Sequence, residues 1–544
     1  MNQVLPLAQF SAMVKSQADK PFLHQPIDRK LQIYTWAEVE DIAKRVAQSL
    51  LQMGLVKGDR VGILSKNCAE WFISDIAIMM AGMISVPIYP TANRDTISYV
   101  IEQSDCKAVF VGKLDGLAEA EAGIITQIPR IVFPYPTIKG QYQWQKLLEN
   151  SPIDVINNPL ATDIFSIVYT SGSTGHPKGV VISYENITSA ATSAVKLMGV
   201  RNSDHIMSYL PLAHITEREL IETVSLLSGC KVFFVESLDT FVEDVKTAQP
   251  HLFISVPRLW NKFQTEILTK VPDKKLQFLL KIPVLSQLIA KKIRNGLGLN
   301  RARSFGSGTA PIPTSTLEWY ARLGMPISEG WGMTETSGLS CSNFPFNKNY
   351  LGTIGKACDC VEMKIGDNQE ILIRGPAVFK QYYLNPEATN ASFTKGWFHT
   401  GDMGSVNSNG VYKIIGRVKE QFKTAKGKYV APAPIENLIA QSNEIEQVCV
   451  FGSGRKQPIA LVVLSQPAKP QSDALNKLLE EILEKVNNQL ESHQKLDHMI
   501  VLKQEWTIEN GLLTPTMKIK RNEIEVKFQN YLEQNLQEKV IWQT

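Results

Sequence analysis

The chain of 544 residues is longer than one domain of ordinary size (~100–200 residues), so we expect more than one folding unit. Its composition, 44% apolar and 20% charged, is that of a globular protein and excludes a disordered or collagen-like chain. With 57 basic and 53 acidic residues the net charge is only +4, which gives no reason to expect a nucleic-acid partner.

The start of the chain and its cysteines predict a cytoplasmic protein. The opening MNQVLPLAQF lacks the basic and apolar regions of a secretory signal. The longest apolar run, residues 276–290, contains Lys281 and Pro283 and is too short to span a membrane. Seven scattered cysteines without an export signal indicate reduced thiols. The only close pair, Cys358 and Cys360, has no Cys or His cluster at metal spacing beside it.

A helix is predicted from about residue 36. Thr35 and Glu38 have the spacing of a capping box, in which each side chain accepts a hydrogen bond from a free helix N–H group of the other. Gly54 is expected to end this helix. Between them, apolar residues recur three or four apart: Val39, Ile42, Val46, Leu50 and Met53.

Strands alternate with helices in the next part of the chain. A second helix is expected at residues 71–81. Runs of strand-forming residues predict strands at 60–64, 107–112, 164–169, 231–235 and 252–256. This alternation favours parallel sheets, so the predicted fold class is α/β.

Residues 261–303 differ from their surroundings in charge. They contain ten basic and two acidic residues, with leucines and isoleucines between the lysines. Two interpretations stay open: a solvated helical surface with its apolar face turned inward, or a patch that contacts an anionic membrane.

The last part of the chain is predicted to be a separate small α+β domain. Residues 404–416 are rich in Gly, Ser and Asn and suit a hairpin that leads to a domain boundary. Strands are expected at 448–451 and 459–464, and the apolar spacing at 474–490 predicts an amphipathic helix. We therefore predict domains at residues 1–415 and 416–544.

The strongest chemical signal is YTSGSTGHPKG at residues 169–179, directly after a predicted strand. Glycines let backbone N–H groups approach an anion, and hydroxyl groups and a lysine add further donors. The pattern favours a triphosphate cradle, with a flexible Ser/Gly loop as the alternative. It is not a Walker loop, because Lys178 is followed by Gly179 and not by Ser or Thr.

This loop resembles the phosphate loop of the adenylate-forming superfamily, which includes acyl-CoA synthetases, luciferases and the adenylation domains of peptide synthetases. Other segments resemble the family's motifs in the expected order: LPLAH at 210–214, GTAP at 308–311, EGWGMTE at 329–335, WFHTGD at 397–402, GRVKE at 416–420 and TPTMKIKR at 514–521. Three of these motifs depart from the usual pattern. Thr309 replaces a glycine, Trp331 replaces a tyrosine, and Thr-Met-Lys replaces Ser-Gly-Lys before Lys520.

The resemblance implies a large multi-part N-terminal α/β domain that binds ATP and the acyl group, and a small mobile C-terminal domain that carries a catalytic lysine. It implies catalytic roles for Lys518, His214, Thr174 and Glu335, with Glu335 and Thr174 also holding Mg²⁺. The implied nucleotide-binding residues are Thr170, Ser171, Gly172, Ser173, Thr174, Gly175, Lys178, Gly308, Thr309, Ala310, Gly330, Trp331, Gly332, Met333, Thr334, Asp402 and Arg417.

Several of these residues also have a local chemical interpretation. Asp402, expected after a turn, has two oxygens that match the two hydroxyls of a ribose, and Glu335 offers the hard oxygen that Mg²⁺ prefers. Taken singly, Asp402 could cap a turn, Glu335 could be a surface or N-cap carboxylate, and Arg417 could be a solvated charge. His214 could be a core histidine and Lys518 part of a solvated basic face. Their joint occurrence in the family order favours function.

The implied reaction is the ATP-dependent conversion of a fatty acid to acyl-AMP, followed by transfer to coenzyme A. PLAHITER at 211–218, SVPRLW at 255–260 and FKTAKGKYVAP at 422–432 resemble long-chain fatty acyl-CoA synthetases. One alternative is transfer of the acyl group to an acyl-carrier protein. A second is a lipid-binding protein without catalysis. The expected location is cytoplasmic, with contact to a membrane surface through 261–303 as the open interpretation given above.

Overall fold

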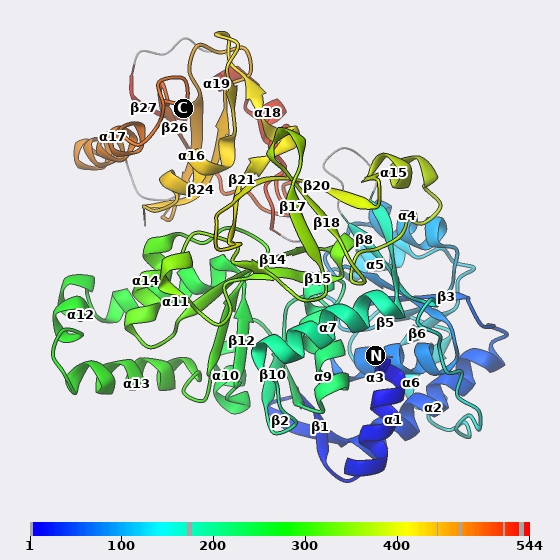
Figure 1. Cartoon of the computed structure of the whole chain (residues 1–544). Helices are drawn as coiled ribbons and strands as arrows, with labels where there is room; N and C mark the ends of the chain where they lie inside the picture. The colour runs from blue at the N-terminus through cyan, green and yellow to red at the C-terminus, as the bar shows by residue number, and fades with distance from the viewer. Residues whose placement is uncertain are drawn as a thin grey trace.

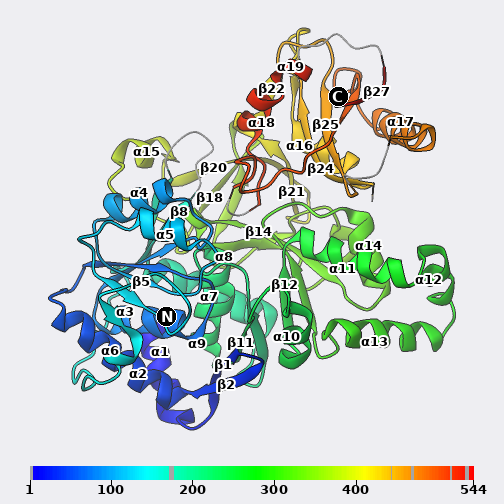
Figure 2. The same cartoon turned by 180° about the vertical axis from the view of Figure 1, so that it is seen from behind.

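The computed structural model describes residues 4–170, 177–442, 444–466, 471–514, 517–532 and 538–543. It is a mixed α/β structure with a large N-terminal part and a smaller C-terminal part, coloured yellow to red in Figure 1, that lies over one side of the large part. Figure 2 shows the same arrangement from behind.

The first third of the chain forms a sheet of seven strands in the order β7-β6-β5-β3-β4-β8-β9. Its pairs are parallel except for β8 and β9, which form an antiparallel pair around the glycine- and hydroxyl-rich segment. The strands are β3 (Arg60–Leu64), β4 (Ile84–Ile88), β5 (Cys106–Val111), β6 (Arg130–Val132), β7 (Tyr142–Gln143), β8 (Ile164–Thr170) and β9 (Lys178–Ser183).

Two further sheets complete the mainly parallel framework. The sheet β12-β13-β14-β15-β16 is parallel from β12 to β14, and the sheet β10-β11-β1-β2 is parallel from β10 to β1. Their strands are β12 (Leu252–Ser255), β13 (Ser304–Ser307), β14 (Ile327–Met333), β15 (Gly338–Ser342), β16 (Lys356–Ala357), β10 (His205–Ser208), β11 (Lys231–Phe234), β1 (Pro21–Ile27) and β2 (Lys30–Thr35).

Helices cover these sheets and fill the space between them. In α2 (Trp36–Gln52) the predicted capping box between Thr35 and Glu38 is present. Every residue of α3 (Ala69–Met80) is buried, so this helix lies inside the core and not on its surface. Other helices of the large part are α1 (Pro6–Gln17), α4 (Arg94–Ser104), α5 (Leu117–Gly123), α7 (Tyr184–Met198), α10 (Phe241–Ala248) and α14 (Thr314–Arg322).

The basic segment predicted at 261–303 folds as helices that project from the side of the large part in both views (Figures 1 and 2). They are α11 (Pro257–Lys270), α12 (Asp273–Leu279) and α13 (Leu285–Leu297). Within the described ranges, no helix combines the length and the apolar character that crossing a bilayer requires.

An antiparallel sheet leads from the large part towards the C-terminal part. It contains β17 (Glu362–Ile365), β18 (Glu370–Arg374), β19 (Phe393–Thr394), β20 (Trp397–Val406) and β21 (Tyr412–Arg417). The predicted hairpin at 404–416 is confirmed, since β20 and β21 pair in antiparallel fashion around it. Asp402 was expected to follow a glycine after a turn, and the turn at residues 395–396 does precede its strand. Asp402 lies inside β20, directly after Gly401, whose φ of 71° only glycine adopts without strain.

The C-terminal part is α+β and has apolar cores of its own. Its main sheet, β24-β25-β26-β27, packs against α17 (Asp473–Asn487), the amphipathic helix predicted at 474–490. Its other elements are β22 (Phe422–Lys423), β23 (Tyr429–Val430), α16 (Pro432–Ile439), β24 (Ile445–Phe451), β25 (Ile459–Leu464), β26 (Met499–Leu502), α18 (Arg521–Lys527), α19 (Gln529–Leu532) and β27 (Val540–Trp542).

Candidate active site

Two predicted nucleotide motifs meet where the parallel strands β13 and β14 run side by side. Ser307, the last residue of β13, pairs with Glu329, so Gly308 comes next to Gly330. A Cβ on Gly308 would lie 3.2 Å from the carbonyl oxygen of Gly330. Carboxyl ends of parallel strands are common ligand sites, because loops that begin there can leave the sheet and surround a bound molecule.

The backbone is tightly constrained at both motifs. A Cβ on Gly332 would lie 1.7 Å from the carbonyl oxygen of Gly338, so only glycine fits there. Thr309, where the family pattern has glycine, keeps the left-handed backbone, with φ of 68°. That conformation is unfavourable for a β-branched residue and shows that the tertiary structure holds this loop in place. Ala310 follows as an exposed residue.

Asp402 is a buried carboxylate held from two sides. Trp331 Nε1 donates a hydrogen bond of 2.9 Å to Oδ2, and Arg417 Nε forms an ion pair of 2.7 Å with Oδ1. Asp402 and Arg417 are cross-strand neighbours in β20 and β21, which brings them together. Burial raises the pKa of Asp402, while Arg417 and the Trp331 bond oppose that shift. Each oxygen keeps a further acceptor site, which suits a pair of hydroxyl donors.

Glu335 lies in a short 3₁₀ turn, Thr334–Thr336, that begins directly after Met333 at the end of β14. Its side chain is buried, and Oε1 accepts a hydrogen bond of 2.9 Å from the hydroxyl of Tyr382. Among the described residues, Oε2 has no hydrogen-bond partner. A buried carboxylate with a free oxygen fits a hard cation such as Mg²⁺.

Tyr382 joins this carboxylate to the glycine-rich segment. Val180 of β9 forms a bridge with Tyr382, and the Lys178 ammonium lies 5.1 Å from the centre of the Tyr382 ring. The exposed Lys178 is therefore brought to the Glu335 side of the site. Thr170, at the other end of the segment, closes β8. The predicted residues Ser171, Gly172, Ser173, Thr174 and Gly175 lie outside the described residues.

His214 precedes the short helix α8 (Ile215–Glu217) and is partly buried. Its Nδ1 accepts a hydrogen bond of 3.2 Å from the backbone N–H of Thr216. Burial, and then the charge of Lys518, lower its pKa to about 3. The ring is therefore neutral at physiological pH, and because Nδ1 is an acceptor, Nε2 carries the proton and can donate to a carboxylate.

Lys518 is presented by a tight loop of the C-terminal part. Leu513 and Ile519 form an antiparallel bridge at the base of the loop. The N–H of Thr514 donates to the Lys518 carbonyl at 2.8 Å, and the Lys518 N–H donates to Thr514 Oγ1 at 3.1 Å. Met517 has φ of 63°, again in the left-handed region at a position where the family usually has glycine.

The ammonium of Lys518 reaches residues of the large part. It interacts electrostatically with Asp402, Glu335 and His214 of that part, and with Arg417, which lies just beyond the predicted boundary. Lost hydration is the largest cause that lowers the pKa of Lys518, followed by the positive charge of Arg417. The residue as a whole keeps exposed surface, so water moderates this shift. Lys520 instead precedes α18 and is exposed.

Two residues of this site were missed in the sequence analysis. Tyr382 lies in no recognisable local pattern, and its contact with Glu335 depends on strand pairing with β9. Glu420, at the end of the GRVKE segment, interacts with both Lys518 and Asp402.

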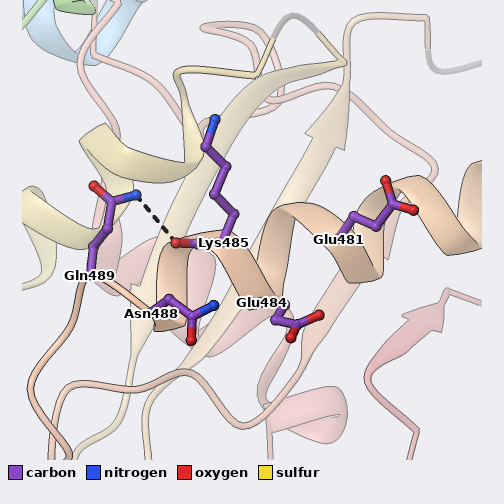
Figure 3. A pocket seen from close by; sticks show the side chains of 5 residues that line it. All are labelled: Glu481, Glu484, Lys485, Asn488 and Gln489. Atoms are coloured by element: carbon purple, nitrogen blue, oxygen red, sulfur yellow. Dashed lines mark hydrogen bonds between the residues drawn. The ribbon is translucent and has the colours of Figure 1, made fainter.

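A surface hollow of about 440 Å³ lies elsewhere, along the outer helix α17. Figure 3 shows its lining residues, which come from the end of α17 and the turn that follows it: Glu481, Glu484, Lys485, Asn488 and Gln489. The Gln489 side chain donates a hydrogen bond to the Lys485 carbonyl. It contains none of the predicted site residues, and its charges are those of a solvated helix face.

Comparison with known proteins places these motifs in a family. The model for AMP-binding enzymes matches residues 10–383, and the model for the AMP-binding enzyme C-terminal domain matches residues 419–539. The chain is 30% identical to fatty acyl-CoA synthetase A of Dictyostelium discoideum, over 93% of this chain and 86% of that protein. It is also 30% identical to long-chain-fatty-acid–CoA ligase 5 of Mus musculus, over 92% of this chain and 84% of that protein.

A solved structure has the same fold at lower identity. The anthranilate CoA ligase AuaEII, solved in complex with anthranoyl-AMP, superposes with a TM-score of 0.82 at 20% identity and covers 98% of both chains.

Proposed function

The chain belongs to the AMP-binding enzyme family, and we propose that it is an ATP-dependent ligase that activates a fatty acid to acyl-AMP and then forms acyl-CoA. The observation that carries this proposal is the position of Lys518. It comes from the C-terminal part of the chain and lies within electrostatic reach of Asp402, Glu335 and His214 of the large part. The long-chain acid is proposed from the names of the relatives, fatty acyl-CoA synthetase and long-chain-fatty-acid–CoA ligase.

In the first step a carboxylate oxygen of the acid attacks the α-phosphorus of ATP. The bond from that phosphorus to the bridging oxygen breaks, and pyrophosphate leaves. Two anions must approach each other, so fixed positive charge and hydrogen-bond donors lower the barrier. Lys518 would neutralise the converging oxygens, Lys178 the phosphates, and His214 Nε2–H would orient the carboxylate.

Asp402 and Arg417 would hold the ribose of ATP, and Gly308, Thr309 and Ala310 would face the adenine beside Gly330, Trp331, Gly332, Met333 and Thr334. Glu335, with Thr174, would hold Mg²⁺, since Glu335 is a buried carboxylate with only Oε1 engaged by Tyr382 among the described residues. A bound Mg²⁺ supplies positive charge beside the phosphates.

In the second step the sulfur of CoA attacks the acyl carbon of acyl-AMP and AMP leaves. An acid-panel assay tests the proposal, with pyrophosphate release measured with and without CoA. We expect acyl-AMP formation with long-chain acids and AMP release that depends on CoA. AMP release that requires an acyl-carrier protein would support the carrier alternative, and no pyrophosphate release with any acid would indicate a lipid-binding protein without catalysis.

The family resemblance implies that one face of the small domain serves acyl-AMP formation and another serves thioester formation, so we propose that this domain pivots near Lys419. Lys419 lies in the 3₁₀ turn Val418–Glu420, between β21 and β22. Proline fixes φ near the helical value of such a turn, so it fits this conformation and resists a change away from it.

Lys419→Pro should therefore keep acyl-AMP formation and lose thioester formation. The two half-reactions are measured separately, with Lys419→Ala as the control that should keep both. Equal loss of both half-reactions in a folded Lys419→Pro variant would contradict the pivot. The boundary between residues 415 and 416 stays a prediction.

We further propose that the helices from 257 to 297 contact an anionic membrane, where long-chain acids partition. Segment 261–303 has ten basic and two acidic residues. The end of the projecting helices exposes large apolar side chains beside these lysines: Phe278 (65% exposed), Ile282 (38%), Val284 (71%) and Leu288 (60%). Apolar side chains at the tip and lysines around them are the pattern of a surface that binds lipid without crossing it.

Replacing Lys274, Lys275, Lys291 and Lys292 with Gln should weaken binding to anionic vesicles by roughly a hundredfold or more, since each lysine contributes about 1 kcal/mol near such lipid. Co-sedimentation with anionic and zwitterionic vesicles at low and high salt measures this binding. The matched control replaces four exposed lysines of the C-terminal part, Lys477, Lys485, Lys495 and Lys503. Vesicle binding that changes neither with salt nor with the first set of substitutions would count against membrane contact.

A further inference from the structure

Arg258 is the residue through which the large part pairs electrostatically with the body of the C-terminal part. Its Nη2 donates a hydrogen bond of 2.7 Å to Glu505 Oε1, and its Nε lies 3.8 Å from Glu446 Oε1. Among the described residues, every ion pair between a residue before Asp402 and a residue after Glu420 involves Arg258. Neither acid is within the nucleotide motifs.

On the large part, Arg258 stands on a rigid base next to the nucleotide site. It lies in the first turn of α11, directly after Pro257. Two residues further on, Trp260 is fully buried, and its Nε1 donates to the carbonyl of Gly306 at 3.1 Å. Gly306 belongs to β13, which leads into the loop at Gly308. The start of α11 is therefore fixed to the strand that carries the predicted adenine loop.

On the C-terminal part, Glu505 begins the segment that leads to Lys518. The Asn510 side chain donates to the Glu505 carbonyl at 2.8 Å, and the Leu513 N–H donates to the Thr507 carbonyl at 3.0 Å. Leu513 in turn pairs with Ile519 at the base of the Lys518 loop. The segment is tied to β24 by hydrogen bonds between Trp506 and Gln447, beside Glu446.

We propose that Arg258 is a positioning residue that holds the C-terminal part in the orientation that places Lys518 in the site. The inference rests on the proposed function, since it assigns Arg258 to the first half-reaction. Release of Arg258 from Glu505 and Glu446 is then part of the change that precedes thioester formation.

The exposure of the pairs suits such a role. The Arg258 side chain is 50% exposed, Glu446 35% and Glu505 37%. Exposed ion pairs are weak, so they shift the balance between two orientations a few-fold and do not lock one of them. A domain that must leave its position in each cycle needs a contact of this strength.

Arg258→Glu should lower acyl-AMP formation by about fivefold to tenfold, because it replaces two attractions with two repulsions. Thioester formation from supplied acyl-AMP should not fall. The double variant Arg258→Glu, Glu505→Arg should recover acyl-AMP formation, since it restores a pair of opposite charge. Arg258→Gln, which removes the charge without reversing it, should show a smaller loss of the same kind.

Arg322→Glu is the matched control, because Arg322 is 54% exposed and pairs with Glu318 inside the large part. It should leave both half-reactions unchanged. Equal loss of both half-reactions in Arg258→Glu, no loss in either, or no recovery in the double variant would overturn the proposal.

A second readout does not depend on any substrate. All seven native cysteines are buried, so cysteines introduced at the exposed positions Lys291 and Glu481 can be labelled selectively with a fluorescent donor and acceptor. In the substrate-free full-length chain we expect one dominant transfer efficiency, and a shifted or broadened distribution after Arg258→Glu. An identical distribution in both proteins would overturn the positioning role of Arg258, whatever the enzyme assays show. Failure of the proposed function would instead appear as no pyrophosphate release by the wild-type protein.

Discussion

Replacing Lys518 with Ala should abolish most acyl-AMP formation while thioester formation from supplied acyl-AMP stays near the wild-type rate. The ammonium is useful while the carboxylate and the α-phosphate converge, and it has no such task once acyl-AMP exists. Loss of one preorganised charge of this kind costs about 3–4 kcal/mol, or roughly a hundredfold to a thousandfold in rate. Pyrophosphate release measures the first step, and acyl-CoA formed from acyl-AMP and CoA measures the second.

Lys520→Ala is the control for this prediction, because the family motif can also be aligned so that Lys520 takes the place of the catalytic lysine. Lys520 is exposed at the start of α18, so its replacement should leave both half-reactions intact. If Lys520→Ala shows the split effect and Lys518→Ala does not, the assignment of the lysine is wrong by two positions. If neither variant shows it, no lysine of this motif serves the first step.

The same ammonium predicts a pH dependence. Its protonated form is the active one, and lost hydration and Arg417 lower its pKa below the ordinary lysine value of 10.5. Acyl-AMP formation should therefore fall as the pH rises through this lowered pKa, starting at a lower pH than an ordinary lysine would give. The charge of Glu420 opposes the shift, so Glu420→Gln should move the alkaline limb to lower pH. An unchanged limb in a pH–rate profile of this variant would contradict the assignment.

Replacing Lys178 with Ala should weaken acyl-AMP formation by about 2–4 kcal/mol if its ammonium meets charge in the transition state. Lys178 starts β9 and its ammonium lies over the ring of Tyr382, whose hydroxyl donates a hydrogen bond to Glu335. The ammonium and the proposed cation site are thus on the same side of the site, where the phosphates would lie. Single-turnover pyrophosphate release at saturating ATP separates a loss in rate from a loss in ATP binding.

Lys380→Ala is the matched control for Lys178. Lys380 is exposed in the same region, but its ammonium pairs with Glu185. Its replacement should leave pyrophosphate release unchanged. Near wild-type acyl-AMP formation in both Lys178→Ala and Thr174→Ala would remove the proposed phosphate cradle.

Local signals in the sequence predicted the elements that depend on neighbouring residues. The helix at Thr35 was predicted because a capping box joins residues three apart, and α17 because its apolar residues recur at helical spacing. The sequence did not show that Asp402 itself lies inside a strand. In the structure Gly401 is a left-handed residue inside a strand, which no local rule distinguishes from a turn.

By itself, the sequence determined the α/β class and the identity of most candidate site residues, since spacing and residue type are properties of short segments. Only the tertiary structure decided which of them meet. Tyr382 reaches Glu335 across 47 positions, and Arg258 reaches Glu505 across 247. Between Lys518 and Lys520 the local motif was ambiguous, whereas the fold directs Lys518 towards Asp402 and leaves Lys520 at a helix start. Contacts between such distant residues depend on how whole sheets pack, and no local pattern in the chain records that packing.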